Sequence, residues 1–260
     1  MTPNATTHET ERRTLLRLES VVVAFGGLVA VRDIELDVAR GDRLAVLGPN
    51  GAGKTTLFNA IAGDITPTKG KVFIRGIDCT ALPSRLRPQL GVARTYQKTR
   101  LFTGLTVEDN LYLAQTGKQR RHLALWRNND DDEYRERARD AARKVWLGER
   151  LDGLVGDLSH GEQRQLEVGM ALVTAPDLIM LDEPASGLSR GEREQLVELL
   201  EDLPVDTTLL LIEHDMDVAL RVASSVVVMA DGEKVAAGTP DEIRRDPLVH
   251  AIYLGEQGEE

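Results

Sequence analysis

Apolar residues along this chain follow the repeats of strands and of helices in turn. Residues 15–25 are rich in Leu and Val, and over residues 28–38 apolar and polar positions roughly alternate, as in a half-buried strand. Shorter and almost wholly apolar runs follow, of the kind found in parallel sheets that are covered on both faces. These runs span residues 44–47, 178–181, 208–212 and 226–229.

Helical spacing lies between several of these runs. Over residues 192–203 the apolar positions follow the i, i+3, i+4, i+7 stripe of an amphipathic helix: Leu196, Leu199, Leu200 and Leu203. Buried strands that alternate with amphipathic helices predict an α/β core.

The middle of the chain has a different character. Residues 118–150 are crowded with charge and include the acidic cluster 130–133. We expect Asp132 to cap a helix, because apolar residues after it share one helical face: Tyr134, Ala138, Ala141 and Val145. A helical insertion into the core is therefore predicted at about 95–166, with its charges forming a solvated face.

Composition narrows the class of protein. The 260 residues carry 32 Lys and Arg against 42 Asp and Glu, and this net charge of −10 argues against nucleic acid as a partner. The single cysteine, Cys79, excludes an intrachain disulfide and a multi-cysteine metal site. Residues 1–13 are polar and expected to be disordered, and no apolar run approaches the roughly 20 residues that span a bilayer. We therefore expect a soluble cytoplasmic protein, which needs a partner if it works at a membrane.

A glycine-rich motif directly follows the apolar run 44–47. Residues 48–55 match G-x-x-x-x-G-K-[ST] at every fixed position. Glycines let backbone N–H groups turn toward phosphates, and the positive N-terminus of a helix expected at 54–62 faces the same anion. Lys54 supplies charge for the β- and γ-phosphates, and the Thr55 hydroxyl suits Mg²⁺. The residues expected to hold a nucleoside triphosphate are Gly48, Pro49, Asn50, Gly51, Ala52, Gly53, Lys54, Thr55 and Thr56.

Acidic residues and a histidine follow two other apolar runs. Asp182 and Glu183 come after the run 178–181, and His214 comes after the run 208–212. Ligands of parallel sheets bind at the carboxyl ends of the strands, so these side chains should meet the phosphates. We expect Asp182 to hold Mg²⁺, Glu183 to activate the attacking water, and His214 to contact the γ-phosphate.

One further segment, together with these motifs, resembles a known protein family. Residues 158–165 read L-S-H-G-E-Q-R-Q, and with the motifs above the chain resembles the ATPase subunit of an ATP-binding cassette (ABC) transporter. His160 and Glu162 depart from the usual L-S-G-G-Q signature, and Ser189 stands where Asp or Asn is more common. Ser159 also fits a helix N-cap with Glu162 as its capping-box acid. The resemblance spans about residues 15–255.

The resemblance implies a fold, a substrate and further site residues. The fold is the P-loop NTPase core of the ABC type, with an antiparallel β subdomain and the helical insertion, in one domain over 14–255 before a short tail at 256–260. The bound molecules are ATP and Mg²⁺. Gln97 joins Asp182 and Thr55 near the metal and acts in catalysis, and Phe25 stacks on adenine.

The same resemblance implies partners. Ser159, Gly161 and Glu162 complete the ATP site of a second ATPase subunit, either a paralogue or another copy, so that ATP closes the pair and hydrolysis opens it. Two membrane-spanning permease subunits would hold the pair at the inner face of the cell membrane, and an extracytoplasmic binding protein would deliver the solute.

Local stretches point to a kind of transporter. Residues 25–31, the charged insertion 118–150, residues 212–217 and the Tyr-Leu-Gly at 253–255 resemble the ATPase subunits of branched-chain amino-acid importers. Urea and amide importers share much of this pattern, including His after Ser in the signature. Both solute classes stay open, and so does a soluble ABC ATPase without a transport role. A P-loop kinase would leave residues 158–165 unexplained.

Overall fold

The computed structural model describes residues 14–95, 101–116 and 130–256, apart from the side chains of residues 130 and 254–256. Two of the predictions above therefore lie outside the described residues. These are the disorder of residues 1–13 and the role of Gln97. The predicted tail, 256–260, lies outside them too except for the backbone of Glu256.

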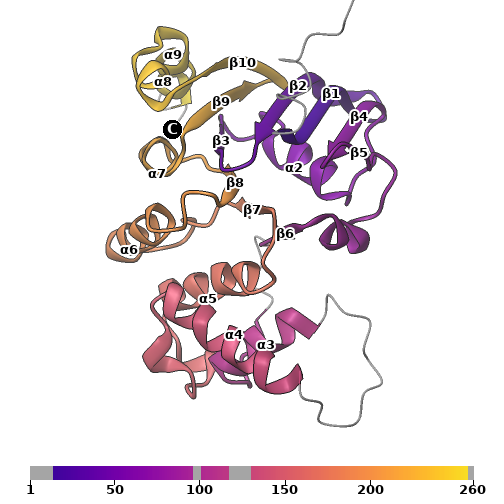
Figure 1. Cartoon of the computed structure of the whole chain (residues 1–260). Coiled ribbons are helices and arrows are strands. Elements are labelled where there is room, and N and C mark those ends of the chain that lie inside the picture. The colour runs from indigo at the N-terminus through magenta and orange to yellow at the C-terminus, as the bar shows by residue number, and fades with distance from the viewer. Residues whose placement is uncertain (1–13, 96–100, 117–129, 257–260) are drawn as a thin grey trace, which may run out of the picture.

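An antiparallel sheet lies at the upper right of Figure 1. Among the described residues it has the strand order β2-β1-β4-β5. Its strands are β1 (Thr14–Phe25), β2 (Leu28–Ala39), β4 (Lys69–Ile74) and β5 (Ile77–Asp78). Buried and exposed residues alternate along much of β2, as its sequence predicted.

A second sheet forms the core, with the order β10-β9-β3-β8-β7-β6 among the described residues. Neighbouring strands run parallel except for β10, which pairs antiparallel with β9. The strands are β3 (Arg43–Leu47), β6 (Val92–Arg94), β7 (Leu178–Asp182), β8 (Thr208–Ile212), β9 (Ser225–Ala230) and β10 (Glu233–Gly238). The apolar runs that the sequence assigned to buried strands are confirmed as β3, β7, β8 and β9.

Helices cover both faces of this core sheet. Alternate residues of β7 point to opposite faces, so Met180 packs in the cluster that contains Phe58 of α2, while Leu181 packs with Leu196 of α6. Figure 1 shows α2 on the side of the antiparallel sheet and α6 to α9 on the other side. The helices are α2 (Lys54–Ala62), α6 (Arg190–Glu201), α7 (Met216–Val222), α8 (Pro240–Arg245) and α9 (Pro247–Glu256).

A helical region separates β6 from β7 and lies at the bottom of Figure 1. Its described helices are α3 (Val107–Thr116), α4 (Asp130–Lys144) and α5 (His160–Leu172). Short 3-10 helices are η1 (Ser84–Leu90), before β6, and η2 (Gly148–Arg150) and η3 (Val155–Asp157), before α5.

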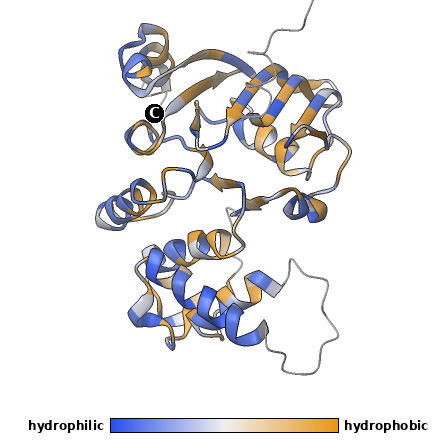
Figure 2. Cartoon of the chain, viewed as in Figure 1, coloured by the Kyte–Doolittle hydropathy of each residue, from blue (hydrophilic) through white to orange (hydrophobic). Residues whose placement is uncertain are grey.

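The charged stretch of this region lies on helix α4. Its buried face includes Ala138 and Ala141, whereas exposed ion pairs such as Arg137–Glu133 line its surface, coloured hydrophilic in Figure 2. The expected cap is wrong: α4 begins at Asp130, so Asp132 already lies in the helix. In a run of aspartates each residue suits a first helical turn, so the sequence alone does not choose among them.

None of the helices within the described ranges combines the length and the apolar character needed to cross a bilayer.

Candidate functional site

The three motifs expected to hold phosphate meet at the carboxyl ends of three neighbouring strands of the core sheet. They follow β3, β7 and β8, which are parallel neighbours in the order β3-β8-β7. The backbone ties the two outer motifs to β8, since the N–H of Glu183 donates to the carbonyl of Ile212 at 2.9 Å and the N–H of Glu213 donates to Val46 at 3.3 Å. The sheet therefore places the glycine-rich loop, the acidic pair and His214 together.

The glycine-rich loop needs glycine at two positions for lack of space. Gly48 has φ +146° and Gly53 has φ +93°, conformations that side chains rarely adopt. A Cβ on Gly48 would lie 2.1 Å from the carbonyl oxygen of Met229, and one on Gly53 would lie 2.3 Å from that of Ala30. A Cβ on Gly51 would meet no atom of the described residues within 4 Å, because that part of the loop faces open space.

Lys54 begins helix α2 and lies within the loop. Its side chain is 5% exposed, and Nζ donates to the carbonyls of Gly48 at 2.6 Å and Pro49 at 2.8 Å. The first turn of α2 contains no acidic residue, and its N-cap, Gly53, has no side chain that could bind the first N–H groups of the helix. The loop therefore combines a held ammonium group with the positive end of a helix, an arrangement that binds anions. Thr55 and Thr56 follow in the same turn and are partly exposed.

Asp182 ends β7 with a side chain only 2% exposed. Its Oδ1 has no hydrogen-bond partner among the described residues, and its Oδ2 lies 3.7 Å from Nη2 of Arg94. Burial raises the pKa of the Asp182 carboxyl, and the positive charge of Arg94 opposes that shift. A buried carboxylate oxygen without a partner suits a hard cation such as Mg²⁺, so these residues fit the metal that the resemblance implied.

Glu183 and His214 face each other from adjacent strand ends. Glu183 adopts φ +46°, an uncommon backbone conformation for a residue other than glycine. Its Oε2 lies 3.9 Å from Nδ1 of His214, and the side chains are 16% and 51% exposed. The mostly buried carboxylate and the half-exposed imidazole therefore lie close together, where a general base and a phosphate contact are expected.

Glu213, which the sequence interpretation did not single out, lies beneath this pair. Its side chain is fully buried; Oε1 accepts the N–H of Ala185 at 3.1 Å, and Oε2 lies 4.0 Å from Nδ1 of His214. Burial raises the pKa of the Glu213 carboxyl. The available signal was a carboxylate between a buried strand and His214, but nothing in the sequence places Ala185 beside it.

Arg94 at the end of β6 was also missed. Nη2 of Arg94 donates to Oδ1 of Asn59 at 2.6 Å, Nη1 pairs with Asp64, and the guanidinium lies 4.7 Å from the centre of the Phe58 ring. It therefore joins helix α2 to the carboxylate of Asp182. Neither the strand β6 nor its pairing with β7 was predicted from the sequence.

The signature residues cap helix α5. Ser159 Oγ accepts the N–H of Glu162 at 3.2 Å, and Glu162 accepts the N–H of Ser159 at 2.8 Å, which confirms the capping box. The N–H of Gly161 donates to Oε1 of Glu192 at 2.9 Å. Figure 1 shows α5 in the helical region and the loop before α2 in the upper part, so the chain does not bring these residues to its own phosphate loop.

The position of Phe25 is compatible with stacking on a base. It ends β1, its side chain is 50% exposed, and it pairs with Leu28 across the turn to β2. Further along β2, Ala30 approaches Gly53 of the phosphate loop. The stacking of Phe25 on adenine stays a prediction.

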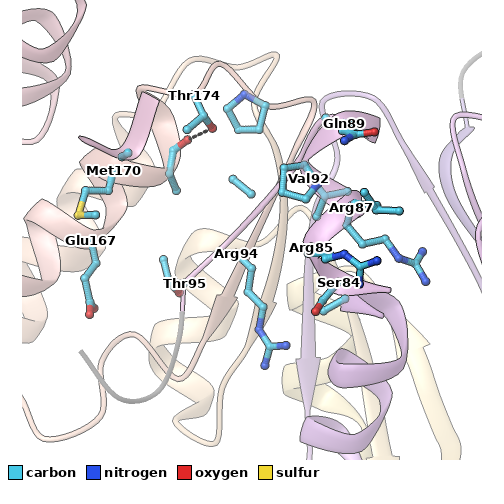
Figure 3. A pocket seen from close by; sticks show the side chains of 18 of the residues that line it. Ser84, Arg85, Arg87, Gln89, Val92, Arg94, Thr95, Glu167, Met170 and Thr174 are labelled. Atoms are coloured by element: carbon cyan, nitrogen blue, oxygen red, sulfur yellow. Dashed lines mark hydrogen bonds between the residues drawn. The ribbon is translucent and has the colours of Figure 1, made fainter. Parts of the chain in front are cut away.

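A cavity of about 520 Å³ lies beside β6, and Arg94 is one of its lining residues. Figure 3 shows Met170 and Glu167 of α5 on one wall and η1, with Arg85 and Gln89, on the other; Arg94 and Thr95 lie between. The cavity also includes Leu101. Its lining therefore reaches both ends of the undescribed stretch 96–100.

Comparison with known proteins agrees with this geometry. Residues 31–186 match the ABC transporter family, and residues 233–259 match the family described as branched-chain amino acid ATP-binding cassette transporter. The chain is 38% identical over 250 residues to the high-affinity branched-chain amino acid transport ATP-binding protein LivG of Salmonella typhimurium, covering 93% of this chain and 98% of LivG.

Solved structures show the same fold. The ADP conformation of MJ1267, an ATP-binding cassette of an ABC transporter, has a TM-score of 0.82 at 30% identity, covering 93% of this chain and 99% of that one. The dimeric structure of MJ0796, a bacterial ABC transporter cassette, has a TM-score of 0.73 at 25% identity, covering 87% and 99%. The sequence-derived expectation of an α/β core with an antiparallel sheet and inserted helices is confirmed.

Proposed function

This chain belongs to the ABC transporter family of ATP-binding cassettes, and on that premise we propose that it powers an importer of branched-chain amino acids. The proposal depends mainly on one observation: four residues of the expected site lie together at the carboxyl ends of β3, β7 and β8. They are Lys54, Asp182, Glu183 and His214. Binding and hydrolysis of ATP follow from the family. The match of residues 233–259 to a branched-chain amino acid family favours that solute class over urea or amides.

Each residue of the site has a distinct task in hydrolysis. The loop N–H groups and the Lys54 ammonium bind the phosphates, and Glu183 accepts a proton from the attacking water. His214 contacts the γ-phosphate from the neighbouring strand end. Asp182 and Thr55 would hold Mg²⁺, together with Gln97, which lies outside the described residues. When bound, Mg²⁺ offsets negative charge on the phosphate oxygens.

The active form in this proposal is a pair of ATPase subunits. Ser159, Gly161 and Glu162 lie apart from the phosphate loop of their own chain, so they suit the ATP of a second subunit. In the isolated chain Glu192 already accepts the Gly161 N–H, and hydrogen bonds from Ser189 and Gly161 hold the pKa of the Glu192 carboxyl below its usual range. An incoming γ-phosphate must therefore replace an ionised carboxylate at Gly161.

Substituting Glu192→Gln tests that exchange. Gln can still serve in the capping box with Ser189, but it binds the Gly161 N–H without a charge. The ATP concentration for half-maximal hydrolysis by the assembled transporter should fall by about three- to tenfold. Glu242→Gln is the matched control, since Glu242 closes an identical capping box with Thr239 on α8. An unchanged or higher ATP requirement in Glu192→Gln would contradict the exchange.

The permease partners are expected at the cavity beside β6. It lies between α5 and η1, has a volume of about 520 Å³ and is lined mainly by residues of these two helices and β6. Its lining includes Thr95 and Leu101, the described residues on either side of the stretch that contains Gln97. This arrangement would hold the subunit at the inner face of the membrane, with the binding protein on the far side.

Reconstitution tests the proposed function. The chain, assembled in vesicles with its permeases and binding protein, should convert ATP to ADP and phosphate, with no phosphorylated acceptor, and drive uptake of radiolabelled leucine. The same vesicles carrying Glu183→Gln should show no uptake. Uptake of urea in place of leucine would overturn the solute assignment, and ATP hydrolysis without any permease association would favour a non-transport ATPase.

A further inference from the structure

Tyr253 of helix α9 contacts the phosphate loop from a remote part of the sequence. Its hydroxyl oxygen accepts the backbone N–H of Gly48 at 3.0 Å, across 205 positions of the chain. Gly48 is the first residue of the loop, and Tyr253 belongs to the Tyr-Leu-Gly segment for which the ATP site described above has no use. The contact therefore joins the branched-chain-type segment 233–259 to the nucleotide site.

Packing holds Tyr253 in this place. Val249 on the preceding turn of α9 is fully buried, and it shares an apolar cluster with Leu47, the last residue of β3. Ile243 of α8 belongs to the same apolar cluster, and the ring of Tyr253 packs against this cluster. Helix α9 is thus fixed against the end of the strand that leads into the loop.

The backbone of Gly48 connects Tyr253 to Lys54 through two successive peptide units. Its N–H donates to the Tyr253 hydroxyl, and its carbonyl accepts from Nζ of Lys54 at 2.6 Å. Gly48 is buried, and its φ of +146° leaves no room for a Cβ beside Met229. Without the hydroxyl, the buried Gly48 N–H would lose its partner, and the Leu47–Gly48 peptide would be free to tilt toward another acceptor. The resulting change in the Gly48 torsion angles would also move the next peptide, whose carbonyl accepts from Lys54.

We propose that Tyr253 is a positioning residue for nucleotide binding, which fixes the backbone of Gly48 and thereby the carbonyl that orients the ammonium of Lys54. The inference rests on the proposed function, since it assumes that the loop binds MgATP. Tyr253 acts on the affinity for nucleotide and not on the chemical step, because its hydroxyl binds the loop after β3, whereas Glu183 and His214 follow β7 and β8. The family-specific segment thereby acquires a role in setting ATP affinity.

The test is Tyr253→Phe, which removes only the hydroxyl. The Michaelis constant for MgATP and its dissociation constant should rise by about three- to tenfold while kcat stays within about twofold. The Gly48 amide should exchange its hydrogen about tenfold faster, as read by NMR. Tyr112→Phe is the matched control, because Tyr112 also loses one hydroxyl hydrogen bond, to Asp131, but lies on α3 in the helical region.

Two results separate failure of this inference from failure of the proposed function. Unchanged MgATP affinity in Tyr253→Phe, or an equal loss in Tyr112→Phe, would overturn the role of Tyr253 while the ATPase assignment stands. Absence of MgATP binding in the unaltered chain would remove the function on which the inference rests.

Discussion

Replacing Glu183 with Gln is expected to lower the rate of ATP hydrolysis by about 10²- to 10⁴-fold, the usual contribution of a general base. The amide keeps the size of the carboxylate but accepts no proton from water near neutral pH. Affinity for MgATP should remain within about threefold of the unaltered chain, because Lys54 and the loop amides are unchanged. Time courses of phosphate release measure the rate of hydrolysis, and titration with nucleotide measures the affinity for MgATP.

The matched control for this variant is Glu198→Gln. Glu198 lies on the exposed side of α6, so the substitution removes one acidic charge without touching the strand ends. It should hydrolyse ATP at the normal rate. A Glu183→Gln protein that turns over ATP as fast as this control would reject Glu183 as the base and with it the proposed division of tasks.

The local pattern of residues was sufficient to predict the strands β3, β7 and β8 and the helices α2 and α6. The apolar runs at 44–47, 178–181 and 208–212 became β3, β7 and β8, because strands buried on both faces carry few polar residues. The helix expected at 54–62 has those bounds in the structure. The stripe of leucines at 196, 199 and 200 lies on the buried face of α6.

Contacts between segments far apart in the chain could not be predicted from the sequence. Glu213 is buried beneath His214 because the loop after Glu183 folds over it, and Arg94 reaches Asp182 because β6 pairs with β7. The Tyr253 hydroxyl reaches Gly48 only through the packing of α9 on the end of β3. A single sequence shows no such pairings, since each depends on tertiary packing and not on local spacing. The antiparallel sheet likewise came from the family resemblance and not from the pattern of residues.

The second large effect is expected from Lys54→Met. Methionine retains much of the apolar length of the side chain but removes the ammonium that donates to the carbonyls of Gly48 and Pro49. Loss of a buried, charge-assisted contact costs about 2 kcal/mol or more, so MgATP should bind at least about 30-fold more weakly. Lys71→Met, on the exposed surface of the antiparallel sheet, is the control of equal charge change and should bind MgATP normally.

The central claim is that the loop after β3, Lys54 and the carboxylate of Asp182 together grip the magnesium complex of ATP. Calorimetric titration of ATP into the unaltered chain and into Lys54→Met, each with magnesium and with a chelator, measures this directly. The account predicts tight binding by the unaltered chain that weakens on chelation, and weak binding by Lys54→Met in both conditions. Equal affinity of the two proteins for ATP, or affinity that does not respond to magnesium, would contradict it.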